Sequence, residues 1–221
     1  MLFHVTGANG RVGQEVTNCL ADLGEVQGTD VEDMDVTNMD SVMSVLRDNP
    51  PDVIVHLAGL KGNIPSQIDP IGFFNVNTSG TLNLLEAARL LEVKHFIFFS
   101  SLTVHGPTNE AIDEFSPLFP QHPYSGSKAA SEYMVHAYSN AYGMKATIFR
   151  PNFIVAATPS PQPYVDNLIY DFIGLIHDTG IIELAGDGQY EREWMHPYDV
   201  ALAVSSAVLS TKKGCETYIL R

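Results

Sequence analysis

Residues 3–16 read FHVTGANGRVGQEV, and this stretch decides the fold. The apolar residues before Gly7 predict a buried strand, and the residues after Gly13 have the apolar spacing of a helix. Gly7, Gly10 and Gly13 lie between the two in a G-x-x-G-x-x-G spacing. Such a loop lets the backbone approach a pyrophosphate at the N-terminus of the helix, although glycines also cluster in plain turns. The stretch therefore predicts a strand, a phosphate-binding loop and a helix.

The same alternation of strand and helix continues outward along the chain. Short apolar stretches predict buried strands at residues 2–6, 25–29, 53–57, 96–100 and 146–149. Apolar residues three to four apart predict amphipathic helices at 12–23, 41–47, 74–91 and 125–142. This order is typical of a parallel sheet with helices on both faces. We predict an α/β fold, a Rossmann-like doubly wound parallel sheet.

The alternation is interrupted at residues 158–163, which read TPSPQP. Beyond them the pattern predicts a helix over 164–177, a short strand over 180–188, a helix over 196–209 and a last strand over 216–220. We expect a nucleotide-binding domain over 1–155, a small C-terminal substrate lid or insertion over 156–193, and a return to the sheet over 194–221.

Composition restricts the class of function. The chain has 221 residues, 45% of them hydrophobic, as in a globular protein with one core. The formal net charge of −14 repels a phosphate polymer, so we expect no nucleic-acid partner. Two cysteines and scattered histidines lack metal-ligand spacing, so we expect no metal. With a first strand expected from Leu2 and no long apolar run, we expect a cytoplasmic chain without a signal peptide or membrane partner.

The second predicted strand ends at Asp30, within GTDVEDMDVT at 28–37. An acidic side chain at this position accepts hydrogen bonds from the adenosine ribose and repels a 2′-phosphate, which favours NAD over NADP. A solvated acidic loop is the alternative, because Glu32, Asp33 and Asp35 follow at once. Arg11, inside the glycine loop, is the one feature that could serve NADP.

Three further residues indicate proton-transfer chemistry. Tyr124 and Lys128 are four positions apart, so they project from one face of a predicted helix. A neighbouring ammonium favours the phenolate, which otherwise forms only near pH 10. Ser101 follows an apolar strand, and open α/β sheets bind ligands at the carboxyl ends of their strands. A serine hydroxyl there can hydrogen-bond the reacting oxygen of a substrate.

Several motifs occur in an order that resembles a known family. They are GANGRVG at 7–13, HLAG at 56–59, NVNTSGTLNLLEAAR at 75–89, SSLTVHG at 100–106, PYSGSK at 123–128, RPN at 150–152 and REWMHPYDVA at 192–201. The chain resembles the extended short-chain dehydrogenase/reductases, the NAD-dependent epimerase/dehydratase group that acts mainly on nucleotide sugars. The resemblance covers nearly the whole chain, and it is specific to the superfamily rather than to one substrate.

The resemblance implies roles for individual residues. Ser101 matches the catalytic serine or threonine, Tyr124 the acid/base, and Lys128 the lysine that also binds the nicotinamide ribose. Implied cofactor contacts are Gly7, Asn9, Gly10, Arg11, Val12, Gly13, Asp30, Asp35, Val36, Leu57, Ala58, Gly59 and Asn77. For Asn77, a structural role in bridging neighbouring elements is an equal alternative. Implied substrate contacts are Asn152, Arg192 and His196.

The chain also departs from the family pattern. Leu102 and Thr103 replace the Asp-Glu pair of the dehydratases, which disfavours dehydration. His105 replaces the usual tyrosine before glycine, a change that the sequence does not explain. Relatives continue into a larger C-terminal domain, so the substrate is small, another subunit completes the pocket, or the chain is truncated.

These observations predict an NAD-dependent epimerase/oxidoreductase that acts on a nucleotide sugar or related sugar through a keto intermediate. Two alternatives stay open. One is a simple NAD(P)-dependent sugar or aldose/uronate dehydrogenase with net oxidation, and the other is a non-catalytic dinucleotide-binding protein. The resemblance also implies a homodimer formed through the helices over 74–91 and 125–142.

Overall fold

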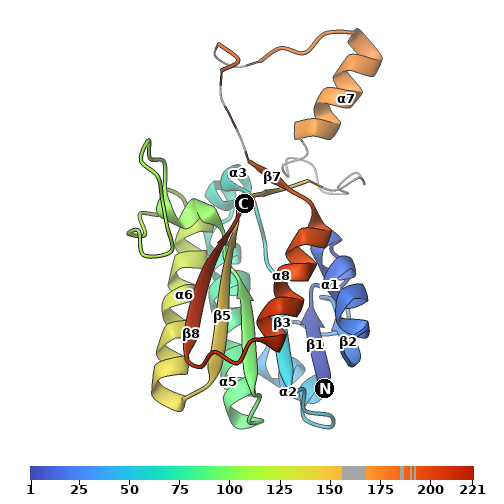
Figure 1. Ribbon diagram of the computed structural model, residues 1–221, viewed down its shortest axis with the longest axis vertical. Helices are drawn as coiled ribbons and strands as arrows, with labels where there is room; N and C mark the ends of the chain where they lie inside the picture. The colour runs from blue at the N-terminus through green and yellow to red at the C-terminus, as the bar shows by residue number, and fades with distance from the viewer. Residues whose placement is uncertain (156–167, 185–186, 190, 192) are drawn as a thin grey trace.

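The computed structural model describes residues 1–155, 168–184, 187–189, 191 and 193–221, and Figure 1 shows their arrangement. Six strands form one parallel sheet in the order β2-β1-β3-β4-β5-β8. The strands are β1 (Leu2–Thr6), β2 (Glu25–Thr29), β3 (Val53–His56), β4 (His95–Phe99), β5 (Lys145–Pro151) and β8 (Cys215–Leu220). Because all six run in the same direction, their carboxyl ends lie along one edge of the sheet. The predicted doubly wound parallel sheet is confirmed.

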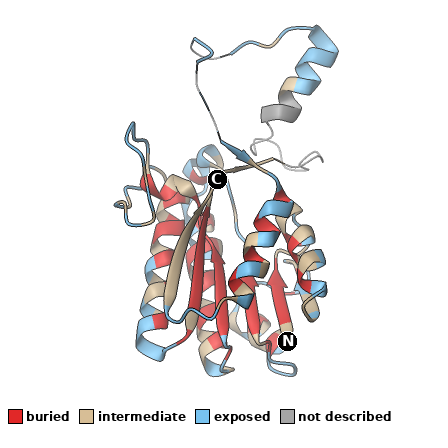
Figure 2. Cartoon of the chain, in the orientation of Figure 1, coloured by how far each residue is buried: buried red, intermediate tan, exposed pale blue. Residues whose placement is uncertain are grey.

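Alternate side chains along each strand point to opposite faces and form two hydrophobic cores. On one face, Phe3 and Val5 pack beneath α1 (Arg11–Ala21) and α8 (Pro197–Leu209). On the other face, Ile54, Phe96 and Phe98 pack beneath α2 (Met39–Leu46), α5 (Gly80–Leu90) and α6 (Pro123–Tyr142). Figure 2 shows that the central strands of the sheet are buried, whereas the edge strand β8 is of intermediate burial.

The helix predicted over 74–91 is divided in the structure. Short helices α3 (Asn63–Ile68) and α4 (Pro70–Phe74) follow β3, and a π-helical turn, η1 (Asn75–Ser79), joins α4 to α5. The wider turn of a π-helix often marks a functional position in a helix. Asn77 lies inside this turn and is almost completely buried.

The segment between β5 and α8 differs from the sequence prediction. Two short strands, β6 (Phe153–Ile154) and β7 (Trp194–Met195), pair with each other and not with the main sheet. Helix α7 (Leu168–Thr179) confirms the predicted helix, whose first residues, 164–167, lie outside the described ones. The strand predicted over 180–188 is wrong for its described residues: 181–184 are exposed or half-buried and have no neighbouring strand, so apolar composition alone does not create one.

None of the helices in the described residues combines the length and apolar character needed to cross a bilayer. No group of three or more His, Cys, Asp or Glu side chains in the same residues could bind a metal ion.

Candidate active site

The glycine loop connects β1 to α1 at the carboxyl edge of the sheet. Gly7 has a φ of +69°, and a Cβ atom there would lie 2.8 Å from the backbone nitrogen of Ala58. A Cβ on Gly13 would lie only 2.2 Å from the carbonyl oxygen of Gly7. The nitrogen of Gly10 donates to this same oxygen over 3.1 Å. The close packing around Gly7 and Gly13, which we call the glycine cradle, therefore leaves no space for a side chain at either position. Arg11 begins α1, and Val12 packs against the core beneath it.

Asp30 follows β2 directly and lies beside the glycine loop. Its Oδ2 accepts a hydrogen bond from the backbone nitrogen of Asn9 over 3.2 Å, and its Oδ1 accepts one from Val31. The carboxylate of Asp33 accepts the backbone N–H of Asp30 over 3.1 Å. Two carboxylates therefore lie at the end of β2.

Asp35 and Val36 have contacts with the chain itself. The Oδ1 atom of Asp35, an exposed residue, accepts hydrogen bonds from the backbone and the hydroxyl of Thr37. Val36 is buried in the core, and its carbonyl accepts from the amide of Asn83. These contacts stabilise the loop after β2, and they leave the adenine-side role of the pair as a prediction.

The end of β3 brings the glycine loop together with the helices. The backbone nitrogens of Leu57 and Ala58 donate to the carbonyl and hydroxyl oxygens of Thr6 in β1. A Cβ atom added to Gly59 would meet Oδ1 of Asn77 at 3.0 Å and Nζ of Lys128 at 3.2 Å. Gly59 therefore allows the close approach of strand, π-helical turn and α6.

Asn77 uses its side-chain amide to bridge three elements. Oδ1 accepts from the nitrogen of Leu60 over 2.8 Å, and Nδ2 donates to the carbonyl of Leu60 and to Oγ of Ser127, both over 3.0 Å. The Ser127 hydroxyl in turn donates to the carbonyl of Tyr124. These contacts match the bridging alternative, and they place the first turn of α6 relative to β3.

Lys128 extends from α6 to the end of β4. It is 6% exposed, and its Nζ donates to the carbonyl oxygen of Phe99 over 2.9 Å. Burial lowers the pKa of Lys128 to about 8, while the negative charge of Glu132 acts in the opposite direction. Tyr124 lies one turn earlier on the same helix, where its ring meets the ring of Phe73 edge-on.

Ser101 is the second residue after the end of β4, two positions beyond the Phe99 carbonyl that Lys128 contacts. It caps the 3₁₀ helix η2 (Leu102–His105): its Oγ accepts from the backbone nitrogen of Thr103 over 3.3 Å and from the Thr103 hydroxyl over 2.9 Å. A serine oxygen has two acceptor positions, and Thr103 uses both. Neither contact with Thr103 uses the hydroxyl hydrogen of Ser101.

The predicted substrate residues have local contacts. Asn152 follows β5, and its amide donates to the carboxylate of Glu193 over 3.3 Å. His196 caps α8, where its Nδ1 accepts from the nitrogen of Tyr198. Arg192 lies outside the described residues. The role of all three toward a substrate stays a prediction.

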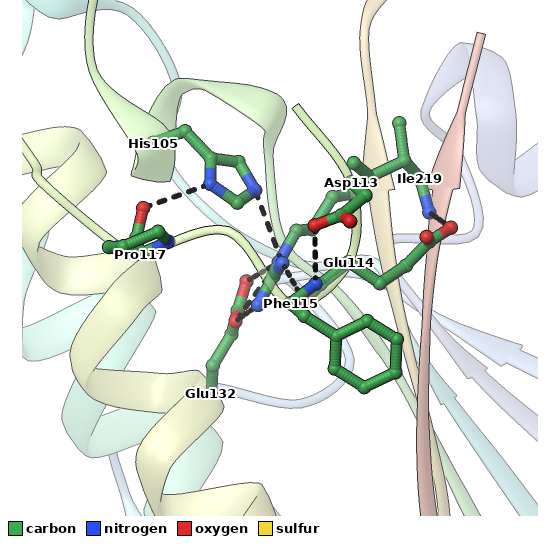
Figure 3. Close-up of polar contacts among 8 residues, drawn as sticks. His105, Asp113, Glu114, Phe115, Pro117, Glu132 and Ile219 are labelled. Atoms are coloured by element: carbon green, nitrogen blue, oxygen red, sulfur yellow. Dashed lines mark hydrogen bonds and ion pairs between the residues drawn. The ribbon is translucent and has the colours of Figure 1, made fainter. Parts of the chain in front are cut away.

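The sequence analysis missed a buried group of charges behind the site. Arg150 of β5 forms an ion pair with Glu132 of α6 and also contacts His105 of η2 (Figure 3). A signal was present, because Glu132 is one helical turn beyond Lys128 and Arg150 lies inside the RPN motif. The sequence alone could not show that Arg150, Glu132 and His105 contact one another, because this depends on how α6, β5 and η2 pack.

Known proteins are similar to this chain in sequence and in fold. A family model described as the NAD dependent epimerase/dehydratase family matches residues 3–219. A UDP-glucose 4-epimerase from Azospirillum brasilense is 26% identical, over 95% of this chain and 69% of its own length. The match spans about half of other curated relatives, such as 51% of a UDP-glucuronate 4-epimerase from Thermodesulfobacterium geofontis.

Two solved structures are similar over the whole chain. The UDP-glucose 4-epimerase of Thermus thermophilus, in complex with NAD, has a TM-score of 0.85 and 26% identity, and 77% of its chain is covered. The dTDP-glucose 4,6-dehydratase DesIV of Streptomyces venezuelae, with NAD and TYD bound, has a TM-score of 0.84 and 27% identity, and 75% of its chain is covered.

Proposed function

Because this chain belongs to the NAD-dependent epimerase/dehydratase family, we propose that it is an NAD-dependent epimerase of a nucleotide sugar, acting through a transient keto intermediate. One observation carries the proposal. Lys128 of α6 reaches the end of β4 two residues before Ser101, so helix and strand tip share one edge of the sheet. Gly59 lies against the same lysine, so the chain after β3 reaches this part of the sheet edge as well.

The chain's own groups suit proton transfer at a ring hydroxyl. Bound NAD supplies the acceptor and donor of hydride. In the proposed reaction the Tyr124 phenolate takes the hydroxyl proton, the Lys128 ammonium stabilises that phenolate, and the Ser101 hydroxyl donates to the substrate oxygen. The same groups return the proton after the keto intermediate has turned over, which completes an epimerisation.

The residues at the edge of the sheet fit NAD better than NADP. The glycine cradle at Gly7 and Gly13 packs tightly at the N-terminus of α1, where backbone N–H groups can receive a pyrophosphate, and the carboxylates of Asp30 and Asp33 would then lie near the adenosine ribose. Calorimetry should show tighter binding of NAD than of NADP. Replacing Asp30 with Ser should narrow that difference, because a neutral side chain no longer repels the 2′-phosphate.

Epimerisation is favoured over dehydration by the turn after β4. Dehydration needs an acid/base pair, whereas Leu102 has no ionisable group and the Thr103 hydroxyl donates to Ser101. Epimerases and dehydratases are both among the similar proteins, and the residues of this turn support the choice of epimerisation.

A panel of UDP- and dTDP-sugars tests the proposal. We expect NAD-loaded protein to form a product sugar without a net change in absorbance by reduced nicotinamide. Stoichiometric growth of that absorbance would instead mean net oxidation, as in a simple sugar dehydrogenase. Tight NAD binding without turnover on any member of the panel would indicate a non-catalytic dinucleotide-binding protein.

We also propose a homodimer formed through α5 and α6. Both helices expose apolar or aromatic side chains, among them Leu90, 50% exposed, and Tyr133, 65% exposed. Sedimentation should show a dimer at micromolar concentration, and a monomer there would contradict this proposal.

A further inference from the structure

Arg150 connects three separate parts of the active-site region. Its Nε and Nη2 atoms donate to the carboxylate of Glu132 in α6, the shorter contact being 2.7 Å. Its Nη1 atom donates to Nε2 of His105 in η2 over 3.1 Å and to the carbonyl of Glu114 over 3.0 Å. Figure 3 shows these contacts converging on one guanidinium.

The group is closed to solvent, so each contact matters. Arg150 is 4% exposed, Glu132 1% and His105 5%. A buried charge that loses a partner costs far more than an exposed one, because water cannot replace the lost contact. Arg150 binds Glu132 through two nitrogens, Nε and Nη2, which makes a bidentate ion pair. Its third nitrogen, Nη1, takes no part in that pair and donates to His105.

Only one form of the His105 ring satisfies both of its neighbours. Nδ1 lies 3.1 Å from the carbonyl oxygen of Pro117 and must carry a proton to donate to it. Nε2 must then lack a proton to accept from Arg150. Protonation of the ring would remove this acceptor and place a second positive charge against the guanidinium.

The groups that face His105 come from three elements. Burial lowers the pKa of His105, the Pro117 hydrogen bond raises it, and the charge of Arg150 lowers it. Glu132 and Asp113 act in the raising direction. The neutral ring is thus favoured by burial and by Arg150.

His105 is coupled to Ser101 by a very short segment. Helix η2 has four residues, with Ser101 as its cap and His105 as its last residue. Gly106, at a φ of +70°, ends the turn, and the nitrogen of Phe119 donates to the carbonyl of Val104. A displacement of His105 therefore displaces the turn that carries the Ser101 hydroxyl.

We propose that His105 is a positioning residue: through Arg150 and Glu132, it holds the turn of Ser101 in register with the helix that carries Tyr124 and Lys128. Glu132 lies one helical turn beyond Lys128, so the same contacts place both ends of the site. The inference rests on the proposed function for its link to turnover, but its geometry can be measured without turnover.

Three variants test the proposal in the full-length protein. His105→Phe removes both ring nitrogens, and His105→Gln keeps an acceptor near the position of Nε2. His95→Gln is the matched control, because His95 is similarly buried at the start of β4 and bonds Thr147 instead. We expect His105→Phe to lower kcat by about tenfold or more with KM and NAD affinity unchanged, as for a misplaced catalytic group.

The pH profile separates positioning from simple stability. We expect the kcat of the wild-type protein to fall at acid pH, where the His105 ring takes up a proton; this fall is the acidic limb of its pH profile. His105→Gln should retain most of the wild-type kcat and should lack this acidic limb, because the titrating ring has been removed. His95→Gln should lower stability and keep the wild-type profile. Wild-type kcat in His105→Phe, or an unchanged acidic limb in His105→Gln, would overturn the proposal.

Nuclear magnetic resonance gives a readout that needs no substrate. The His105 ring should be neutral with the proton on Nδ1 at pH 6.5, and His105→Gln should shift amide signals at 101–103 and 124–132 more than those at 7–13. A ring protonated on Nε2, or shifts confined to residue 105 and its neighbours, would overturn the proposal. If the wild-type protein shows the expected ring form and signal shifts but no turnover, the proposed function is contradicted and the positioning proposal is not.

Discussion

The two sides of the active-site edge are built in different ways. At the ends of β1 and β3, closely packed backbone and glycine residues form the glycine cradle, as the contacts of Gly7 and Gly13 show. At the ends of β4 and β5, buried polar side chains contact one another, as Arg150 does with Glu132 and His105. The first side is therefore sensitive to added volume, whereas the second is sensitive to lost hydrogen bonds and changed charge.

Tyr124→Phe should separate the two sides most strongly. Loss of the acid/base should lower turnover by about 10²–10⁴-fold, while NAD affinity stays nearly unchanged. Steady-state kinetics and calorimetry measure the two effects. Tyr133→Phe is the control, since Tyr133 is exposed on the same helix. Lost NAD affinity with turnover retained would contradict the assignment.

Gly13→Ala should affect the opposite side. Its methyl group would collide with the Gly7 carbonyl, so the loop must shift, and NAD affinity should fall by at least about tenfold, the equivalent of about 1.4 kcal/mol. Gly174→Ala is the matched control, because a Cβ there has no atom within 4 Å. Wild-type NAD binding by Gly13→Ala would show that the cradle does not receive the pyrophosphate.

Low pH should destabilise the whole folded sheet, and with it both sides of the edge. The reason is a set of buried histidines that connect neighbouring strands and helices. Burial lowers the pKa of His4 to about 4 and those of His56 and His95 to about 3. Each bonds a threonine of a neighbouring element: His4 bonds Thr29, His56 bonds Thr6 and Thr81, and His95 bonds Thr147.

Between pH 6.5 and about 4 the unfolded chain binds more protons at these rings than the folded chain does. The free energy of unfolding should therefore decrease as pH falls, by up to about 1.4 kcal/mol per pH unit for each ring. Urea unfolding at several pH values measures the slope, and His95→Gln should make it shallower. An identical slope in that variant would exclude His95 as a contributor.

Thr103→Val should give the smallest effect, confined to the catalytic side. Valine keeps the shape of threonine but loses the hydroxyl that donates to Ser101, a contact worth about 1 kcal/mol, or about fivefold in kcat. Thr103→Ser should restore the rate, because it restores the hydroxyl. An equal loss in both variants would mean that packing, and not this hydrogen bond, matters at position 103.

The same contrast explains how much could be predicted from sequence. The sheet and glycine loop were predicted because apolar spacing reports burial directly, and parallel strands end at one edge. The strand expected over 180–188 was wrong because a strand also needs a partner, which spacing does not report. The interrupted helix around Asn77 was missed for a similar reason: Asn77 bonds Leu60 and Ser127, which belong to other parts of the fold and which apolar spacing does not report.

The doubly wound fold, the glycine cradle and the positions of Ser101, Tyr124 and Lys128 on their elements could all be predicted from the amino-acid sequence. Tertiary structure alone decided what surrounds them: the single acceptable ring form of His105, the bidentate ion pair between Arg150 and Glu132, and the hydroxyl of Thr103 on Ser101. The physical reason is that periodicity depends on each residue's own burial, whereas a buried hydrogen bond depends on two groups brought within about 3 Å by the packing of separate elements.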